Sequence, residues 1–413
     1  MPIEDRGPES VLAIPDYRRF VASRFLMIVA IQMASVSVGW QVYQLTRDPL
    51  ALGFIGLAEA LAYFAAALFG GHHADTHDRQ RTMAACTGGL VLCQAALLWL
   101  TWCCGDILRR TVLPIYGVIA ATGVVRAFLG PSVMALGAQI VPRHLYSNMA
   151  AYNSLTFQIG SIGGPAAAGL IYGFWGARAA YGTALAMGLA SLVAAAAIPS
   201  YGVPRKNGEE PILASLATGV KFVFGNKVIL PAMSLDMLAV LFGGATMILP
   251  MVADNVLHVG PRGLGFLRAA PSIGAGLMAL TLAHRPPLKN AGLKLLWAVA
   301  GFGACMLAFA LSRSFWLSLL ALAASGAADN ISVVIRQTII QLYTPDEMRG
   351  RVSAVNGVFI GSSNEIGAFE SGVAAKVLGL VPSLLFNSGM TLLVTGVVAR
   401  LAPALRRLDL RKH

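Results

Sequence analysis

Twelve long runs of mostly apolar residues dominate this 413-residue chain. A helix needs roughly 20 such residues to cross the hydrocarbon core of a bilayer. The strands of a membrane barrel would instead show short segments of alternating polarity. The sequence therefore predicts an all-α integral membrane protein with twelve transmembrane helices, near residues 20–45, 50–71, 82–104, 112–141, 147–174, 178–199, 228–256, 263–284, 291–312, 315–343, 352–375 and 380–404.

The composition excludes most other classes of protein. Charged residues make up 12% of the chain and hydrophobic residues 56%, whereas soluble domains average about 25% charged residues. A soluble enzyme, a disordered chain and a disulfide-stapled secreted domain are therefore excluded. The five cysteines form no CxxC pair, so no metal site and no cofactor are expected. The net charge of +12 is spread over short gaps between the runs, so no nucleic-acid partner is expected.

The longest polar interval divides the runs into two sets of six. It predicts an N-terminal six-helix bundle at 1–200, a cytoplasmic linker at 201–227 and a C-terminal six-helix bundle at 228–413. The stretch 211–225 within this linker is expected to form a short helix along the membrane surface.

An internal repeat with an offset of 203 residues supports this division. Two six-helix repeats related by an axis along the membrane normal are a known transporter architecture. The fold is therefore expected to contain two pseudo-symmetric bundles. The matching residues include Pro142 with Pro345, Asn153 with Asn356, Gly164 with Gly367, and Gly169 with Gly372.

The basic residues predict the orientation of the chain. The intervals on the side of both termini hold 21 Lys and Arg residues, and those on the opposite side hold six. Cytoplasmic loops carry the excess of positive charge in multi-pass proteins. Both termini are therefore expected in the cytoplasm of a bacterium, with the chain in its inner membrane.

The interval after the second run, residues 71–81, reads Gly-His-His-Ala-Asp-Thr-His-Asp-Arg-Gln-Arg. It resembles the Gly-x-x-x-Asp-Arg-x-Gly-Arg-Arg loop of the major facilitator superfamily. The resemblance implies that this loop is a conformational latch that holds one state of the transport cycle. A loop with only a topological role is the alternative. The matching residues are Gly71, Asp75, Arg79 and Arg81, whereas Thr76 and Asp78 depart from the pattern.

The fifth run resembles the Gly-x-x-x-Gly-Pro element that is associated with exporters of this superfamily. Glycines four residues apart permit close helix contact, and a proline can kink a membrane helix. The element therefore predicts a hinge or packing surface, and ordinary tight packing is the alternative. Its residues are Gly160, Gly164, Pro165 and Gly169. Segments 265–270, 336–351 and 364–372 further resemble the enterobactin-exporter branch.

Few charged residues lie inside the runs, where each costs at least about 2.5 kcal/mol on insertion scales and is a functional hypothesis by default. The candidates for proton coupling or for lining a cavity are Glu59, Arg126, Asp236, Asp329, Arg336 and Glu365; Arg268 and Glu370 are the other charges in runs.

The repeat offset makes Arg126 equivalent to Asp329. We therefore expect Arg126 to act with Glu59, Asp329 or Glu365 across one cavity, since all four lie near the middle of their runs. The resemblance implies that the first, fourth, seventh and tenth helices line this cavity. A static ion pair that holds helices together is the alternative.

The resemblance implies a secondary active exporter rather than an enzyme. It would move an amphipathic small molecule, siderophore-like or drug-like, by alternating access in exchange for protons. The expected partners are this substrate, protons and membrane lipids, and the chain is expected to act as a monomer. A lysophospholipid or lipid translocator of the same fold is one alternative, and a membrane-embedded enzyme or sensor is another.

Overall fold

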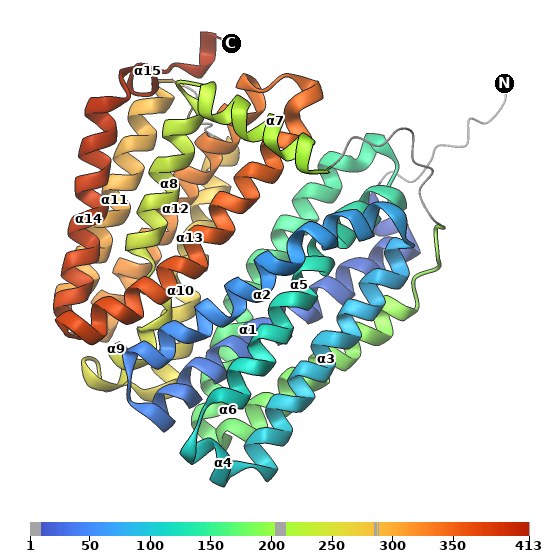
Figure 1. Ribbon diagram of the computed structural model, residues 1–413, viewed down its shortest axis with the longest axis vertical. Helices are drawn as coiled ribbons and strands as arrows, with labels where there is room; N and C mark the ends of the chain where they lie inside the picture. The colour runs from blue at the N-terminus through green and yellow to red at the C-terminus, as the bar shows by residue number, and fades with distance from the viewer. Residues whose placement is uncertain (1–9, 203–211, 285–286, 288, 413) are drawn as a thin grey trace. The chain divides into compact units, whose positions relative to one another are not determined.

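The computed structural model describes residues 10–202, 212–284, 287 and 289–412 (Figure 1). All regular secondary structure in these residues is helical. By packing, the chain divides into a first unit, residues 1–38 with 61–208, and a second unit, residues 39–60 with 209–413. The second unit thus includes the end of the first helix and the start of the second. The domain boundaries expected from the sequence stay a prediction.

The first unit is a helical bundle that contains α3. This helix packs against both α5 and α6. Tyr17, Phe20 and Leu136 are fully buried in the core of this unit. Its elements are α1 (Pro15–Thr46), α2 (Pro49–Thr76), α3 (Arg79–Cys103), α4 (Gly105–Arg110), α5 (Leu113–Ile140) and α6 (Tyr146–Ala196), of which α1 and α2 also contribute to the second unit.

Helix α6 spans two of the expected runs. Its helical dihedral angles are interrupted at Gly176, where φ is 81°, a conformation that favours glycine. Pro165 lies inside the helix without such an interruption. The observed break therefore lies between the expected runs at 147–174 and 178–199, and the hinge role of Pro165 stays a prediction.

The glycines of the fifth run lie against α1. A Cβ atom at Gly160 would lie 2.6 Å from Cγ2 of Ile28, and one at Gly164 would lie 2.7 Å from Cβ of Gln32. The repeat-related Gly367 makes the equivalent contact in the second unit, because its Cβ would lie 2.7 Å from the carbonyl oxygen of Leu241 in α8. The internal repeat is therefore also a repeat of helix packing.

The second unit contains the remaining helices. Helix α12 packs against α10 and α11, while α8 packs against α13 and α14 (Figure 1). Met233, Leu295 and Ile339 are fully buried in its core. The elements are α7 (Ile212–Gly225), α8 (Ile229–Gly243), α9 (Leu249–Asn255), α10 (Gly260–His284), α11 (Ala291–Leu311), α12 (Phe315–Tyr343), α13 (Arg349–Leu378), α14 (Leu380–Leu401) and α15 (Pro403–Arg406).

The expected run at 228–256 is interrupted in the structure. Helix α8 ends at Gly243, a 3-10 turn occupies Ala245–Met247, and α9 begins at Leu249. Two consecutive glycines disfavour helix continuation, and Pro250 suits the first turn of the new helix. The hydropathy of this run did not reveal the interruption, because glycine and proline are common in membrane helices.

The number of membrane-crossing helices is close to expectation. Nine helices in the described residues are long and apolar enough to cross a membrane, and the bent pair of α7 and α8 would make ten. One of the nine spans Arg143–Ala196 and contains the break at Gly176, and α13 is not among them. The count of twelve therefore stays a prediction. The stretch expected to form a short helix is helical as α7, which bends by 99° from α8. Its location along the membrane surface stays a prediction.

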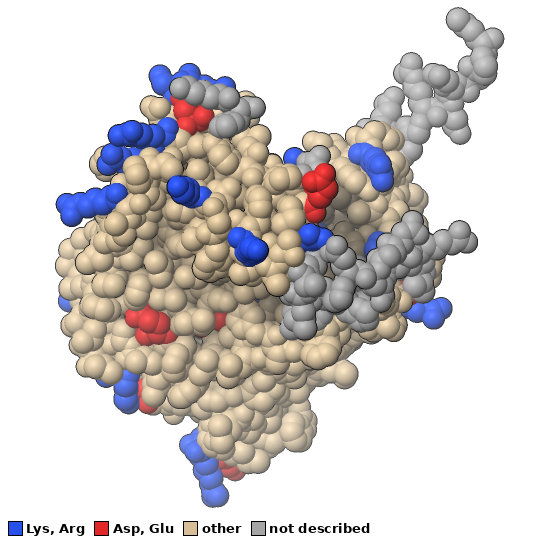
Figure 2. All heavy atoms as spheres, turned by 45° about the horizontal axis from the view of Figure 1, so that its top comes forward, with Lys and Arg blue, Asp and Glu red and all other residues tan. Residues whose placement is uncertain are grey.

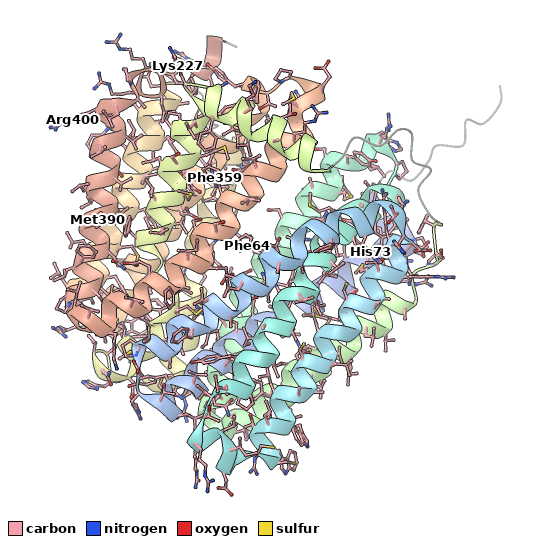
Figure 3. The ribbon with its side chains drawn as sticks, in the orientation of Figure 1. Phe64, His73, Lys227, Phe359, Met390 and Arg400 are labelled. Carbon is pink, nitrogen blue, oxygen red and sulfur yellow. The ribbon has the colours of Figure 1, made fainter. Side chains whose placement is uncertain are left out.

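The surface also suits a bilayer. The face shown in Figure 2 is mostly free of charged side chains. Trp102, Trp175 and Trp316 are exposed near helix ends or breaks, as in the aromatic belts of membrane proteins. Lys227 and Arg400 lie at the same end of the second unit (Figure 3). The chain is a multi-pass membrane protein.

Candidate functional site

Asp236 and Arg336 form a buried ion pair inside the second unit. The Asp236 side chain in α8 is 6% exposed and that of Arg336 in α12 is 3% exposed. The Nη1 atom of Arg336 donates a hydrogen bond to Oδ2 of Asp236. Both residues were candidates from the sequence, and the structure brings them together across 100 residues of chain.

A cavity of about 290 Å³ lies beside this pair, at the interruption between α8 and α9. Arg268 of α10, Asp329 of α12 and Asn364 of α13 supply its charged and amide groups. The rest of the lining consists of Val240, Gly243, Gly244, Thr246, Leu249, Pro271, Phe302, Met306, Leu322, Ser325 and Gly326.

Close packing of α10 against α12 fixes the wall that carries Asp329. A Cβ at Gly274 would lie 1.7 Å from the carbonyl oxygen of Ala323, and one at Gly326 would lie 2.0 Å from that of Pro271. Only glycine permits such an approach of two helix backbones. The two charged residues Arg268 and Asp329 are thereby held on helices in direct contact.

Arg268 is already engaged by the protein. Its Nη1 donates to the carbonyl oxygen of Thr246 at 2.9 Å, and its charge interacts with that of Glu365. The Ser371 hydroxyl donates to the carbonyl oxygen of Gly244 at 3.2 Å. These donors satisfy carbonyls that the interrupted helix leaves without intrahelical partners, as membrane-embedded breaks require.

Asp329 differs from the other charged residues near the cavity. Its carboxylate makes no hydrogen bond or ion pair with another residue in the described part of the chain. Arg336 pairs with Asp236, and Arg268 interacts with Glu365. Both arginines near the cavity are therefore paired with other acids, and Asp329 forms no salt bridge in the described residues.

A second, small space connects Asp329 with the ion pair. It measures about 10 Å³ and is lined by Asp236, Asp329, Ser332 and apolar side chains. This is about the smallest space that holds a water molecule. Asp329 thus lines both the large cavity and the small space next to Asp236.

The remaining candidates are distributed over both units. Arg126 lies in α5 of the first unit, whereas Glu59 in α2 and Glu365 in α13 belong to the second. A pairing of Arg126 with Glu59, Asp329 or Glu365 would join the two units and stays a prediction. Glu370 accepts a hydrogen bond from Nδ2 of Asn387 at 3.0 Å and does not line the cavity. No group of His, Cys, Asp and Glu in the described residues could hold a metal ion.

The predicted latch is only partly visible. Residues 71–76 of the expected loop are the last turns of α2, because this helix continues to Thr76. The surroundings of Gly71 and of the Asp75 side chain lie outside what the structure describes. Nη1 of Arg79 donates to the carbonyl oxygen of Ala135 at 3.4 Å, and Arg81 is exposed. The latch role stays a prediction.

Asp78, which departs from the superfamily pattern, caps the N-terminus of α3. Its Oδ1 accepts hydrogen bonds from the backbone N–H groups of Gln80 at 2.9 Å and Arg81 at 3.1 Å, and its Oδ2 accepts one from the Ser200 hydroxyl. Partial burial raises the pKa of Asp78, but these hydrogen bonds outweigh it and hold the pKa below its usual value.

We expect Asp78→Ala to reduce the free energy of unfolding by about 1 kcal/mol, as for other lost caps. Because the folded-state pKa is lowered, this stabilisation is complete above the pKa of an unfolded aspartate and is lost as pH falls through the lowered folded value. Unfolding in detergent at neutral and acid pH measures it. Asp106→Ala is the control, because Asp106 is 97% exposed. Equal effects of the two substitutions would contradict the capping role.

Sequence reasoning missed a polar cluster at the end of α1. The Tyr43 hydroxyl donates toward Oδ2 of Asp254 at 2.9 Å and Oδ1 of Asn255 at 2.8 Å, and Arg47 pairs with Asp254. Nζ of Lys376 lies 3.0 Å from an oxygen of Asp48. These contacts hold residues 39–60 within the second unit. The sequence signal for this cluster was a group of polar residues at the ends of apolar runs. These residues were interpreted only as parts of loops.

A multi-pass helical bundle that surrounds buried charges and a cavity is an arrangement found in secondary transporters. The family model of transmembrane secretion effectors matches residues 12–412. The chain belongs to this family of the major facilitator superfamily.

Similar proteins agree with this assignment. The enterobactin exporter EntS of Shigella dysenteriae serotype 1 (strain Sd197) is 26% identical over 395 residues, which cover 93% of this chain and 91% of that protein. EntS of Escherichia coli O1:K1 / APEC gives the same values.

Solved structures share the fold at low sequence identity. A POT family transporter in complex with a thioalcohol-conjugated peptide has a TM-score of 0.76 at 11% identity, over 94% of this chain and 96% of that one. A D-xylose-proton symporter has a TM-score of 0.70 at 14% identity, over 94% and 98%.

Proposed function

We propose that this protein exports an amphipathic small molecule, siderophore-like or drug-like, across the bacterial inner membrane in exchange for protons. It acts by alternating access as a monomer, with both termini in the cytoplasm. The similarity to enterobactin exporters supports the outward direction, and the basic asymmetry of the loops supports the orientation. The superfamily loop at 71–81 supports the latch role of Gly71, Asp75, Arg79 and Arg81.

The observation that carries the proton coupling is the position of Asp329. An ionised carboxylate within an apolar helix bundle is costly unless it is paired or solvated. Arg336 forms its salt bridge with Asp236 and its charge also acts on Asp329, so these two acids share one arginine. A proton is the simplest counter-charge for the second acid. Asp329 also borders a cavity large enough to hold water, which gives the proton a route of exchange. We therefore assign Asp329 as the acid that gains and loses the coupled proton.

Liposomes that contain the purified wild-type protein provide the test. Cationic, anionic and neutral fluorescent amphiphiles are offered with an imposed pH gradient and no nucleotide. At least one dye should move against its concentration gradient, and a protonophore should stop this movement. Dye movement that persists unchanged with the protonophore would show that transport is not coupled to protons.

A further inference from the structure

The cavity at the interrupted helix is much larger than a site for a proton alone requires. Its volume of about 290 Å³ corresponds to roughly ten water molecules or to a small organic group. One part of its wall is apolar and includes the aromatic ring of Phe302 together with Met306 and Leu322. Such a mixture of apolar walls and a few polar groups is typical of small-molecule sites.

The groups left to interact with a ligand in this cavity are mainly electron-rich. The Asp329 carboxylate makes no hydrogen bond or salt bridge among the described residues, although the charge of Arg336 acts on it as well as on Asp236. Asn364 donates its amide N–H to the carbonyl oxygen of Ile360 at 2.9 Å, which leaves its Oδ1 as an acceptor. Phe302 adds a ring face that attracts cations.

Arg268 is the positive group in the lining, and its charge is already offset. It donates to the carbonyl oxygen of Thr246 and interacts with Glu365. An anionic ligand would have to compete with both partners of Arg268 and approach Asp329 at the same time. A cationic ligand would instead meet an acid that makes no salt bridge and shares the charge of Arg336 with Asp236.

We infer that this cavity binds the cationic group of an amphipathic amine or quaternary ammonium compound, which replaces the proton on Asp329. The inference rests on the proposed proton exchange and names the class of substrate. One carboxylate then serves both ligands in turn. A cation that arrives releases the proton, and a proton that returns releases the cation, so exchange of the two follows from their competition for one site.

The charged groups around Asp329 come from four helices. They are Asp236 of α8, Arg268 of α10, Arg336 of α12 and Glu365 of α13, and α11 contributes only uncharged residues such as Phe302 to the cavity. The four form two oppositely charged pairs and leave the single exchangeable charge on Asp329. Competition with one proton predicts that the affinity for a permanent cation rises with pH, by at most about tenfold per pH unit.

Calorimetric titration of the purified full-length protein in detergent tests this inference. The probes are benzyltrimethylammonium, whose charge does not depend on pH, and benzenesulfonate, which has a similar ring and the opposite charge. Wild type is compared with Asp329→Asn and with Glu370→Gln. The second variant is the matched control, because Glu370 is a membrane-embedded acid that does not line the cavity. Thermal unfolding of each variant verifies that it is folded.

Wild type and Glu370→Gln should bind benzyltrimethylammonium more tightly as pH rises and should release protons on binding. Asp329→Asn should bind it at least about tenfold more weakly, with no dependence on pH. Absence of binding to wild type, equal binding of benzenesulfonate, or unchanged binding to folded Asp329→Asn would each overturn the inference. If no cation binds and Asp329→Asn still loses gradient-driven transport of an anionic dye, the proton exchange stands and the substrate class is wrong.

Discussion

Asp329→Asn is expected to reduce gradient-driven transport in liposomes to the level of protein-free vesicles. Asparagine preserves the size of the side chain and its hydrogen-bonding atoms, but it cannot exchange a proton or carry a negative charge. The large effect follows from the position of Asp329, because Asp236 and Glu365 already interact with Arg336 and Arg268. Neither acid can replace Asp329 in proton exchange, because its protonation would leave an arginine without a negatively charged partner.

The comparison needs equal amounts of folded protein in each vesicle preparation. Glu370→Gln is again the control and should transport like wild type, because Glu370 is hydrogen-bonded to Asn387 away from the cavity. Asp329→Asn should retain its folded state, since removal of an unpaired buried charge does not break an ion pair. Wild-type transport by folded Asp329→Asn would mean that this carboxylate has no part in coupling.

Arg336→Gln is expected to destabilise the second unit by about 3–5 kcal/mol, the usual effect of removing one partner of a buried ion pair. The substitution leaves Asp236 with an exposed fraction of 6% and no counter-charge. Asp329 lies next to it across the small space, so a second acid would further disfavour the ionised form. Unfolding of the purified variant in detergent measures the loss.

The double variant Asp236→Asn with Arg336→Gln tests whether the unpaired charge or the altered packing causes the loss of stability. Both side chains then remain polar and similar in size, and no unpaired charge is buried. Most of the lost stability should return, because neutral replacements of a buried pair often cost little. If both variants are equally unstable, Arg336 stabilises the unit through its shape and not through its charge.

The helices could be predicted from the sequence because apolar length alone decides whether a segment can cross a bilayer. The short helix before α8, the break near Gly176 and the close contact at Gly164 also followed from local sequence. The interruption at Gly244 was missed, because its glycines and Pro250 lie in a run whose hydropathy is continuous. It requires Arg268 and Ser371 from other helices to satisfy its carbonyls.

The candidate charges could be found from the sequence, but their partners could not. A buried charge is visible as a polar residue in an apolar run, whereas its partner depends on how helices rotate and pack. Asp236 and Arg336 are 100 residues apart, and the offset between repeats had directed attention to Arg126 and Asp329 instead. The lack of a salt bridge to Asp329 became visible only after Arg268 and Arg336 had been assigned to other groups.

Infrared difference spectroscopy tests the central claim most directly, because a protonated carboxylic acid and a carboxylate have separate absorption bands. The purified protein is titrated with and without benzyltrimethylammonium, for wild type, Asp329→Asn and Glu370→Gln. The account predicts that cation binding at constant pH removes a protonated carboxyl band from wild type and from Glu370→Gln, and that no such loss occurs in Asp329→Asn. The same cation-dependent loss of the band in Asp329→Asn would contradict the account.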